Sequence, residues 1–433
     1  MSDPVRPWLA GRSPSADEPA PEARTAPWLT IVGMGDDGLA SLSQEALTAL
    51  DRASVIFGGE RHLRLLGETR AETIVWSTPF ADALRRLMGY AGQPTVVLAT
   101  GDPMWFGVGA TLARHLEPQD MRILPAQSAF SLAAAKLRWP LQSTGCLTVH
   151  GRPVDQLARH LAPGERLLVL SADKDSPRSI ARLLTSRGFG QSRLTVMEHL
   201  GGADERIRET VAAGYDLADE ADLNLVGIEC VAGRAATPRP TTAGLPDDAF
   251  VHDGKMTKRV LRALAVATLC PLPGARLWDI GAGAGSIAIE WLRAAPRTQA
   301  VAIEPKPERC RMIAENAATL GVPELQIIEG EAPQALAGLT APDAIFIGGG
   351  LSDGVFDAAF EALRPGGRLV AHAVTLESEA VLIDLHARFG GELMRVAVDR
   401  AEPVGPYRGF KPSMPVVHWH VEKPFAAPAE RPA

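Results

Sequence analysis

The 433-residue sequence lacks paired cysteines, long apolar runs and a basic surplus, and each absence excludes a class of protein. No two of its four cysteines form a CxxC pair, which speaks against a zinc site and a disulfide framework. No stretch reaches the ~20 apolar residues of a membrane helix. A formal net charge of −7 does not suit a general nucleic-acid binder. We therefore expect a protein with no metal, membrane or nucleic-acid partner.

Chain length and composition predict two domains with unstructured connections. Residues 1–26 are rich in proline, alanine and charge and contain no apolar signal core, so we expect a disordered leader on a cytoplasmic protein. Residues 232–245 read as a linker because they are rich in proline, threonine and alanine. We expect folded domains at 27–231 and 246–425, and a disordered tail at 426–433.

Both expected domains alternate strands with helices, which predicts α/β folds with parallel layers. Residues 27–231 should form two α/β lobes joined near residues 141–146. Residues 246–425 contain seven expected strands, typical of one doubly wound, Rossmann-like domain. Its last two strands, "LMRVAVDR" and "VVHWHVE", should form an antiparallel hairpin. Because the glycine patterns of the two halves differ, we expect two unlike units and no duplication.

The stretch "DIGAGAGS" predicts a ligand-binding loop between a strand and a helix. Gly281, Gly283 and Gly285 let the backbone turn sharply and approach a ligand, with Ala282 and Ala284 between them. The helix that follows offers free N–H groups to electron-rich parts of a ligand. A dinucleotide fingerprint, G-x-G-x-x-G, would place its third glycine where this chain has Ser286.

An acidic residue at the end of the next strand narrows the choice of ligand. Glu304 follows Gly285 by 19 residues, a position from which a carboxylate can accept hydrogen bonds from both ribose hydroxyls. Glu331 and Ala332 follow the third strand, where adenine would lie. The pattern favours S-adenosylmethionine. An NAD site or a glycine-rich packing turn remains the alternative.

The segment from Pro246 to Trp291 carries a specific resemblance. "PDDAFVHDGKMTKR", followed by the glycine loop, is similar to the start of the cobalamin-pathway C15 methyltransferase family, and the similarity runs into the 420s. It implies a class I methyltransferase in which Thr257 contacts the donor. It also implies substrate contacts from a basic cluster, although such a cluster is often only a solvated face. The cluster comprises His252, Lys255, Lys258 and Arg259.

The first half resembles a different family. "LTIVGMGDDGL", "ATGDPMWFGVG" and "PAQSAFSLAAAKLRW" are similar to the tetrapyrrole methylase superfamily, in particular to its C5-methylating members. Those members often have Gly-Pro-Gly after the first glycines, whereas here Asp36 and Asp37 precede Gly38. The resemblance implies a donor pocket in this half, although Asp102 also suits a simple turn. The implied lining residues are Gly33, Gly35, Gly101, Asp102 and Ser128.

Together the resemblances imply a bifunctional C-methyltransferase of cobalamin biosynthesis with one S-adenosylmethionine per domain. The implied substrate is the reduced tetrapyrrole precorrin-6B, which is methylated at C5 and C15 and decarboxylated at its C12 acetate to give precorrin-8X. The implied enzyme is a dimer or tetramer. The enamine-like ring carbons are themselves nucleophiles, so no catalytic Ser, Cys or metal is expected, and no catalytic residue is assigned. An RNA methyltransferase, an NAD(P)-dependent oxidoreductase and a tetrapyrrole carrier without turnover remain alternatives.

Two features near the C-terminus stay open. The segment "PVGPYRGFKPSMPVV", with Tyr407, Arg408 and Lys411, either covers the cleft or forms a plain hairpin loop. His418 and His420 share a strand face, but without a third ligand packing is the better interpretation.

Overall fold

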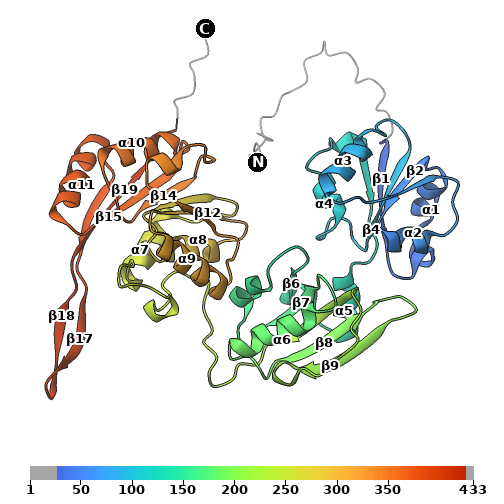
Figure 1. The fold of residues 1–433 in the computed structure, drawn as a ribbon, viewed down its shortest axis with the longest axis horizontal. Helices are drawn as coiled ribbons and strands as arrows, with labels where there is room; N and C mark the ends of the chain where they lie inside the picture. Colours follow the sequence, from blue (N-terminus) through green and yellow to red (C-terminus); the bar gives the residue numbers. More distant parts are fainter. Residues whose placement is uncertain (1–26, 426–433) are drawn as a thin grey trace, which may run out of the picture. The chain divides into compact units, whose positions relative to one another are not determined.

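The computed structural model describes residues 27–425, which divide into two compact units (Figure 1). The first comprises residues 27–154 and 162–237, and the second residues 155–161 and 238–425. The expected leader and tail lie outside the described residues. Within residues 27–425, no helix is both long and apolar enough to cross a membrane.

The first unit begins with a fully parallel five-stranded sheet of order β3-β2-β4-β1-β5. Helices α1 (Gln44–Asp51) and α2 (Glu60–Leu66) cover one face, and α3 (Phe80–Met88) and α4 (Val108–Leu112) cover the other. Adjacent strands β1 and β4 carry their loops at the same edge, where ligands bind in open α/β sheets. The strands are β1 (Leu29–Met34), β2 (Val55–Gly58), β3 (Glu72–Val75), β4 (Thr95–Thr100) and β5 (Met121–Leu124).

The second sheet of this unit is mixed, so the expected parallel layers are wrong here. In the order β6-β7-β10-β8-β9 only β6 and β7 are parallel. Strand β9, which the sequence analysis missed, follows β8 through a short connection, and short connections produce antiparallel neighbours. The strands are β6 (Gly145–Thr148), β7 (Arg166–Leu170), β8 (Arg193–Glu198), β9 (Arg206–Val211) and β10 (Asn224–Glu229).

The junction between the two lobes precedes the predicted position. Helix α5 (Ala129–Leu137) packs Phe130 and Ala133 against Leu168 and Met197 of the second sheet. The second lobe therefore starts before α5 and not near residues 141–146. Another helix of this lobe, α6 (Ser176–Ser186), buries Ile180.

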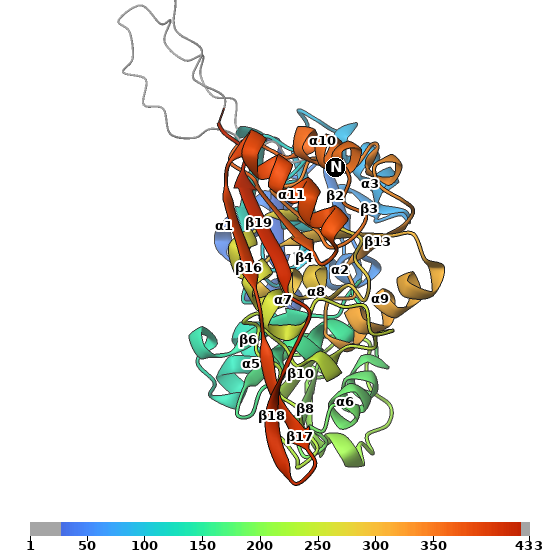
Figure 2. The ribbon, with the colours of Figure 1, turned by 90° about the vertical axis from the view of Figure 1, so that its left-hand side faces the viewer.

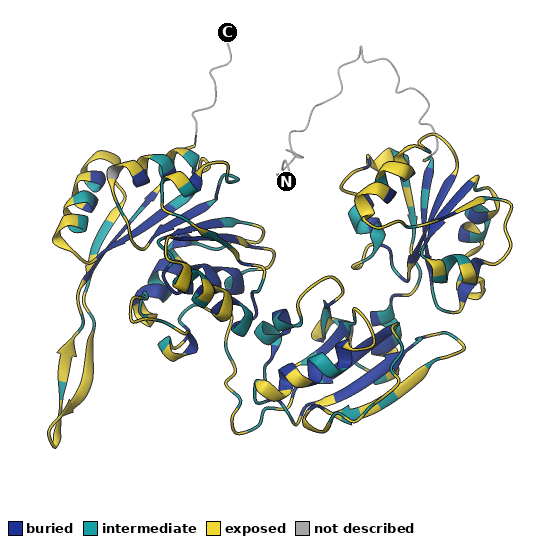
Figure 3. Ribbon diagram, in the orientation of Figure 1, coloured by how far each residue is buried: buried dark blue, intermediate teal, exposed yellow. Residues whose placement is uncertain are grey.

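The second unit contains a seven-stranded mixed sheet of order β13-β12-β11-β14-β15-β19-β16, which confirms the predicted doubly wound fold. Helices α7 (Arg259–Leu269), α8 (Ser286–Ala294) and α9 (Pro307–Thr319) pack on one face, and α10 (Asp353–Ala362) and α11 (Leu376–Phe389) pack on the other. Between these layers lie the seven strands, of which the central ones are buried (Figure 3). The strands are β11 (Arg276–Ile280), β12 (Gln299–Glu304), β13 (Gln326–Glu329), β14 (Ala344–Ile347), β15 (Arg368–Ala373), β16 (Glu392–Val396) and β19 (Val416–Glu422).

The last two sheet strands are antiparallel, as predicted, but their connection is itself a two-stranded ribbon. Strands β17 (Asp399–Val404) and β18 (Tyr407–Pro412) extend away from the seven-stranded sheet (Figures 1 and 2). Their side chains are almost all exposed. "LMRVAVDR" is therefore two strands and not one. We name residues 399–412 the ribbon.

Candidate functional site

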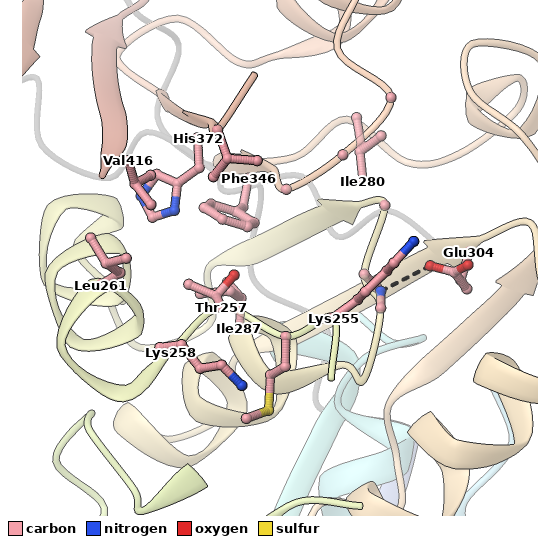
Figure 4. Close-up of a pocket in the computed structure, with 18 of the residues that line it drawn as sticks. Lys255, Thr257, Lys258, Leu261, Ile280, Ile287, Glu304, Phe346, His372 and Val416 are labelled. Carbon is pink, nitrogen blue, oxygen red and sulfur yellow. Dashed lines mark hydrogen bonds between the residues drawn. The ribbon is translucent and has the colours of Figure 1, made fainter. Parts of the chain in front are cut away.

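The second unit contains a cavity of about 900 Å³ at the carboxyl ends of β11, β12, β14 and β15 (Figure 4). This volume lies in the upper part of the range for small-molecule sites. The predicted residues that line it come from four segments far apart in the sequence, three loops and the end of β12. They are Lys255, Thr257, Lys258, Gly281, Ala282, Gly283, Glu304, Glu331 and Ala332.

The glycine loop needs its glycines for packing within the protein. Gly281, Gly283 and Gly285 have φ values of +68°, +62° and +74°, which disfavour any other residue. A Cβ on Gly281 would lie 2.7 Å from the carbonyl oxygen of Gly349. The N–H groups of Gly281 and Ala282 donate to the carbonyl of Ile303. Four of the loop's five N–H groups bond inside the protein, so a ligand meets a loop whose shape is already fixed.

Glu304 is held as a buried, hydrogen-bonded carboxylate at the cavity. Its side chain is 2% exposed, and Oε2 accepts a hydrogen bond of 2.9 Å from the Gly283 N–H. Oε1 lies 3.6 Å from Nη1 of Arg309, a cavity residue that the sequence analysis missed. Glu304 thus links β12 to the glycine loop and presents acceptor oxygens beside the cavity.

The basic segment before α7 is only partly a cavity wall. Lys255, Thr257 and Lys258 line the cavity, with Lys255 and Lys258 extending beside it in Figure 4. His252 does not line it, and its Nδ1 accepts the Gly254 N–H. Arg259 begins α7 and is exposed. Two of the four residues expected to bind substrate therefore face the cavity.

A buried ion pair fixes this segment. Arg262 is fully buried, donates from Nε to Glu290 over 2.7 Å and from Nη1 to the carbonyl of Thr257 over 2.7 Å. Glu290 also accepts the N–H groups of Gly244 and Leu245. Leu245, expected in the linker, is buried in this unit's core. The pair therefore ties the segment preceding α7 to the helices behind the cavity.

A histidine missed by the sequence analysis closes the apolar end of the cavity. His372, on β15, lies beside Phe346 and Val416 in Figure 4. Its Nε2 is 2.9 Å from Nδ1 of His418, and burial lowers the pKa of His372 to about 3 and that of His418 to about 4. Both rings are therefore neutral at physiological pH. The rings of His418 and His420 are near each other, with centroids 6.4 Å apart, and His418 is buried by packing, but its hydrogen-bond partner is His372.

The ribbon contributes to this cavity only at its base. Arg400 of the ribbon lines the cavity, as do Ser413 and Met414 directly after it, whereas Tyr407 is 77% exposed at the tip. The segment with Tyr407, Arg408 and Lys411 is thus an ordered hairpin whose tip does not cover the cavity.

In the first unit, the predicted donor residues gather where β1 and β4 end. A Cβ on Gly33 would lie 2.0 Å from the Gly101 carbonyl oxygen, and one on Gly101 would lie 3.2 Å from Cα of Ser128. Ser128 caps α5 by accepting the Ser131 N–H. Asp102 accepts the Met104 N–H within its own turn.

Within residues 27–425, no three His, Cys, Asp or Glu side chains lie close enough together to hold a metal ion. In the second unit, three structural features fit an adenosyl donor. The cavity lies at the strand edge, a preformed glycine loop forms one wall, and a buried carboxylate ends the second strand. This fold and site define the class, an S-adenosylmethionine-dependent methyltransferase.

Comparisons with known proteins identify the family. Residues 28–214 match the tetrapyrrole (corrin/porphyrin) methylases, and residues 248–423 match the precorrin methyltransferase domain. A precorrin-6Y C(5,15)-methyltransferase (decarboxylating) of Sinorhizobium sp. is 51% identical over 399 residues, which are 92% of this chain and 97% of the relative. The chain belongs to the family of decarboxylating precorrin-6Y C(5,15)-methyltransferases of cobalamin biosynthesis. Both resemblances found in the sequence are thereby confirmed.

Two shorter relatives each match less than half of this chain. A cobalt-precorrin-7 C(5)-methyltransferase of Salmonella typhimurium is 31% identical over 195 residues, 44% of this chain and 95% of the relative. A cobalt-precorrin-6B C(15)-methyltransferase (decarboxylating) of the same organism is 34% identical over 166 residues, 37% of this chain and 85% of the relative. Their names divide the two methylations between separate proteins.

Proposed function

We propose that the first unit of this chain methylates a precorrin ring at C5, and that the second methylates it at C15 and releases the C12 acetate carboxyl group as carbon dioxide. The observation that carries the proposal is a match over nearly the whole chain to a relative named for both methylations. The sequence favours precorrin-6B as the first substrate; the shorter C15-methylating relative is named for the cobalt form of this ring, and the relative that spans the chain is named for precorrin-6Y. We place the enzyme in the cytoplasm.

The names of the shorter relatives also support an order. The C15 enzyme is named for cobalt-precorrin-6B and the C5 enzyme for cobalt-precorrin-7, a later number in the series. We therefore propose that the second unit acts before the first, and that the chain as a whole gives precorrin-8X.

Each unit binds its own S-adenosylmethionine. In the second unit we assign the ribose to Glu304, the adenine to Glu331 and Ala332, and the remaining contacts to Thr257 and the glycine loop, Gly281 to Gly285. Support comes from the Glu304 carboxylate beside the cavity and from the fixed loop conformation. In the first unit we assign the donor to Gly33, Gly35, Gly101, Asp102 and Ser128; support comes from the backbones of Gly33, Gly101 and Ser128, which converge where β1 and β4 end.

The sulfonium donor supplies an electrophilic methyl group, and the ring carbon is the nucleophile, so the protein's work is chiefly positioning. Lys255 and Lys258 can pair with the carboxylates of the ring, since charge-assisted pairs both attract and orient. Phe346, Val416 and Leu261 form an apolar wall that excludes water from the reacting carbon. His252 and Arg259 remain available outside the cavity for ring carboxylates that extend beyond its mouth.

We place decarboxylation in the second unit. Loss of carbon dioxide from an acetate side chain leaves an electron pair that the conjugated ring must accept, so the breaking bond has to be aligned with the ring. The cavity that aligns the ring for C15 methylation can do this as well. The name of the shorter C15-methylating relative, which includes "decarboxylating", supports this placement.

We propose a dimer or tetramer in which the ribbon takes part. Val404, Tyr407 and Phe410 are 62%, 77% and 78% exposed. A two-stranded ribbon is marginal by itself, and clustered exposed apolar side chains mark interaction surfaces. Light scattering coupled to size exclusion should give an oligomer for the unaltered protein and smaller species for the Tyr407→Ser/Phe410→Ser variant.

The deciding experiment supplies precorrin-6B and methyl-labelled donor to the whole chain and locates the label by NMR. Label at both C5 and C15, with about two donor equivalents bound in calorimetry, supports the proposal. Label at a single ring position, or one donor site in the intact chain, contradicts it. An unlabelled ring would favour a carrier without turnover.

A further inference from the structure

A polar cluster that the donor site does not explain joins the two lobes of the first unit. Asp36 lies in the loop after β1, and its carboxylate bonds to residues from two other elements. Oδ1 accepts from Nη1 of Arg61 over 2.6 Å, and Oδ2 lies 2.7 Å from Nδ1 of His199, just after β8 in the other lobe. Arg61 also donates to Thr100, the last residue of β4. The cluster therefore adjoins the residues assigned to the donor.

The hydrogen bond to Asp36 selects the tautomer of the neutral His199 ring. Burial works to raise the pKa of Asp36, but hydrogen bonds from His199 and Arg61 outweigh it and hold that pKa below its ordinary value. The carboxylate accepts from Nδ1 of His199, so in the neutral form of the ring the hydrogen is on Nδ1 and the lone pair is on Nε2. Within residues 27–425 no hydrogen bond to that Nε2 is formed, and 28% of the side chain is exposed. This is the arrangement of an oriented general base.

The backbone holds this histidine in an uncommon conformation. His199 has a φ of +49°, in the left-handed region. Its carbonyl accepts the Gly202 N–H, and a Cβ on Gly202 would lie 2.7 Å from Oδ2 of Asp36. The turn is thus packed directly against the Asp36 carboxylate. Strain of this kind persists where the surroundings impose it, and such sites concentrate where a side chain must be aimed.

The proposed C5 methylation requires a base. As C5 bonds to the donor methyl carbon, the methyl–sulfur bond breaks and the thioether leaves with that electron pair. C5 then carries both the new methyl group and its original hydrogen. Conjugation returns only when the C5–H bond breaks, its electrons re-entering the ring and its proton passing to a base.

We propose that Nε2 of His199 accepts this proton and that Asp36 is a positioning residue that fixes the reactive tautomer. The inference rests on the proposed C5 activity of the first unit. His62, the other histidine of the cluster, is not the base: its Nε2 faces Thr100 and Arg61, and its Nδ1 is buried without a partner.

The test uses the full chain with His199→Asn, Asp36→Asn and the control Asp37→Asn. Asparagine tolerates the left-handed region and its amide can still donate to Asp36, so His199→Asn removes the base while keeping the turn. Asp36→Asn presents an amide donor to the ring and favours the wrong tautomer. Asp37 carries the same charge one residue away but bonds only within its own lobe, to Ser41.

We expect His199→Asn to lower kcat for C5 methylation about 100-fold, within the usual range for a lost general base. KM for donor and ring should stay within about twofold, and a substrate deuterated at C5 should show a larger isotope effect than with the unaltered enzyme. Asp36→Asn should lower kcat in the same way, and Asp37→Asn should change neither. A His199→Asn enzyme with unaltered C5 kcat overturns the inference, as does a loss expressed in KM alone.

C15 methylation by the second unit is the internal reference. It should be unchanged in all three variants, which shows that the preparation is active. If the unaltered protein itself fails to methylate C5, the proposed function has failed and not the assignment of His199.

Discussion

Replacing Glu304 tests the donor site of the second unit most directly. Oε2 of this carboxylate accepts the Gly283 N–H and Oε1 accepts the Lys306 N–H, and the side chain also lines the cavity, where we assign the ribose to it. A hydrogen bond to a charged group contributes about 1.5–3 kcal/mol. Glu304→Gln keeps an oxygen for Gly283 and an amide that a hydroxyl can accept from, so the lower figure applies. We expect the donor Kd to rise about 10-fold.

Glu304→Ala removes both functions. The upper figure then applies, and the Kd should rise about 150-fold. Because the Gly283 N–H loses its partner inside the protein, the melting temperature should also fall, which it should not do in Glu304→Gln. Calorimetric titration of S-adenosylmethionine into residues 238–433 measures the affinity, and far-ultraviolet circular dichroism checks the fold.

The matched control is Glu329→Gln. Glu329 pairs with Glu304 in register on the neighbouring strand but is exposed and does not line the cavity. Its replacement should leave the Kd within twofold. Donor binding by a folded Glu304→Ala variant at unaltered affinity would refute the ribose assignment, and so would an equal loss in Glu329→Gln.

Three further outcomes are expected of the second unit. Arg262→Met leaves the Glu290 carboxylate buried without its cation and should cost about 3–5 kcal/mol of unfolding free energy by urea titration, whereas Arg364→Met at a half-exposed pair should cost under about 1 kcal/mol. Histidines in the unfolded chain take up protons near pH 6.5, whereas the pKa of His372 is about 3 and that of His418 about 4 in the folded protein. The unfolding free energy should therefore be at its full value above pH 6.5 and should fall as the pH drops towards 4. An unfolding free energy that stays constant from pH 7 to 5 would contradict this. Residues 238–433 should release labelled carbon dioxide from precorrin-6B, and release by residues 1–237 would move the decarboxylation to the first unit.

The parts of the fold and site that the sequence predicted are those encoded locally. The glycine loop, Glu304 and the Glu331–Ala332 pair each follow a strand within a few residues, and parallel strands bring their ends to one edge. That geometry follows from the strand pattern alone.

What the sequence did not reveal depends on contacts across long separations. Asp36 and His199 are 163 residues apart, and neither stands in a spacing that marks a pair. His372 and His418 meet only because β15 and β19 are hydrogen-bonded neighbours, a pairing that sequence periodicity does not encode. The stretches "EHLGG", which contains His199, and "GGERHL", which contains Arg61, place polar residues directly at strand ends, and this was the available signal for the cluster.

The second sheet and the ribbon were misread for a different reason. Alternating strands and helices predict parallel layers, but short connections around β8 and β9 override that pattern. In "LMRVAVDR" the alternation of apolar residues continues where the chain passes from the seven-stranded sheet into the ribbon, so the pattern predicts a single strand.

The bonds from Glu290 to Gly244 and Leu245 constrain how this two-domain gene could be divided or rebuilt. Family resemblance begins at Pro246, which makes that residue an attractive point for fission into two genes or for exchange of one domain. A domain starting there would retain the Glu290 carboxylate but lose two of its three sources of hydrogen bonds. Those few residues of linker composition must therefore travel with the C-terminal domain whenever the two are separated, and domain exchange should succeed only when the junction lies upstream of them.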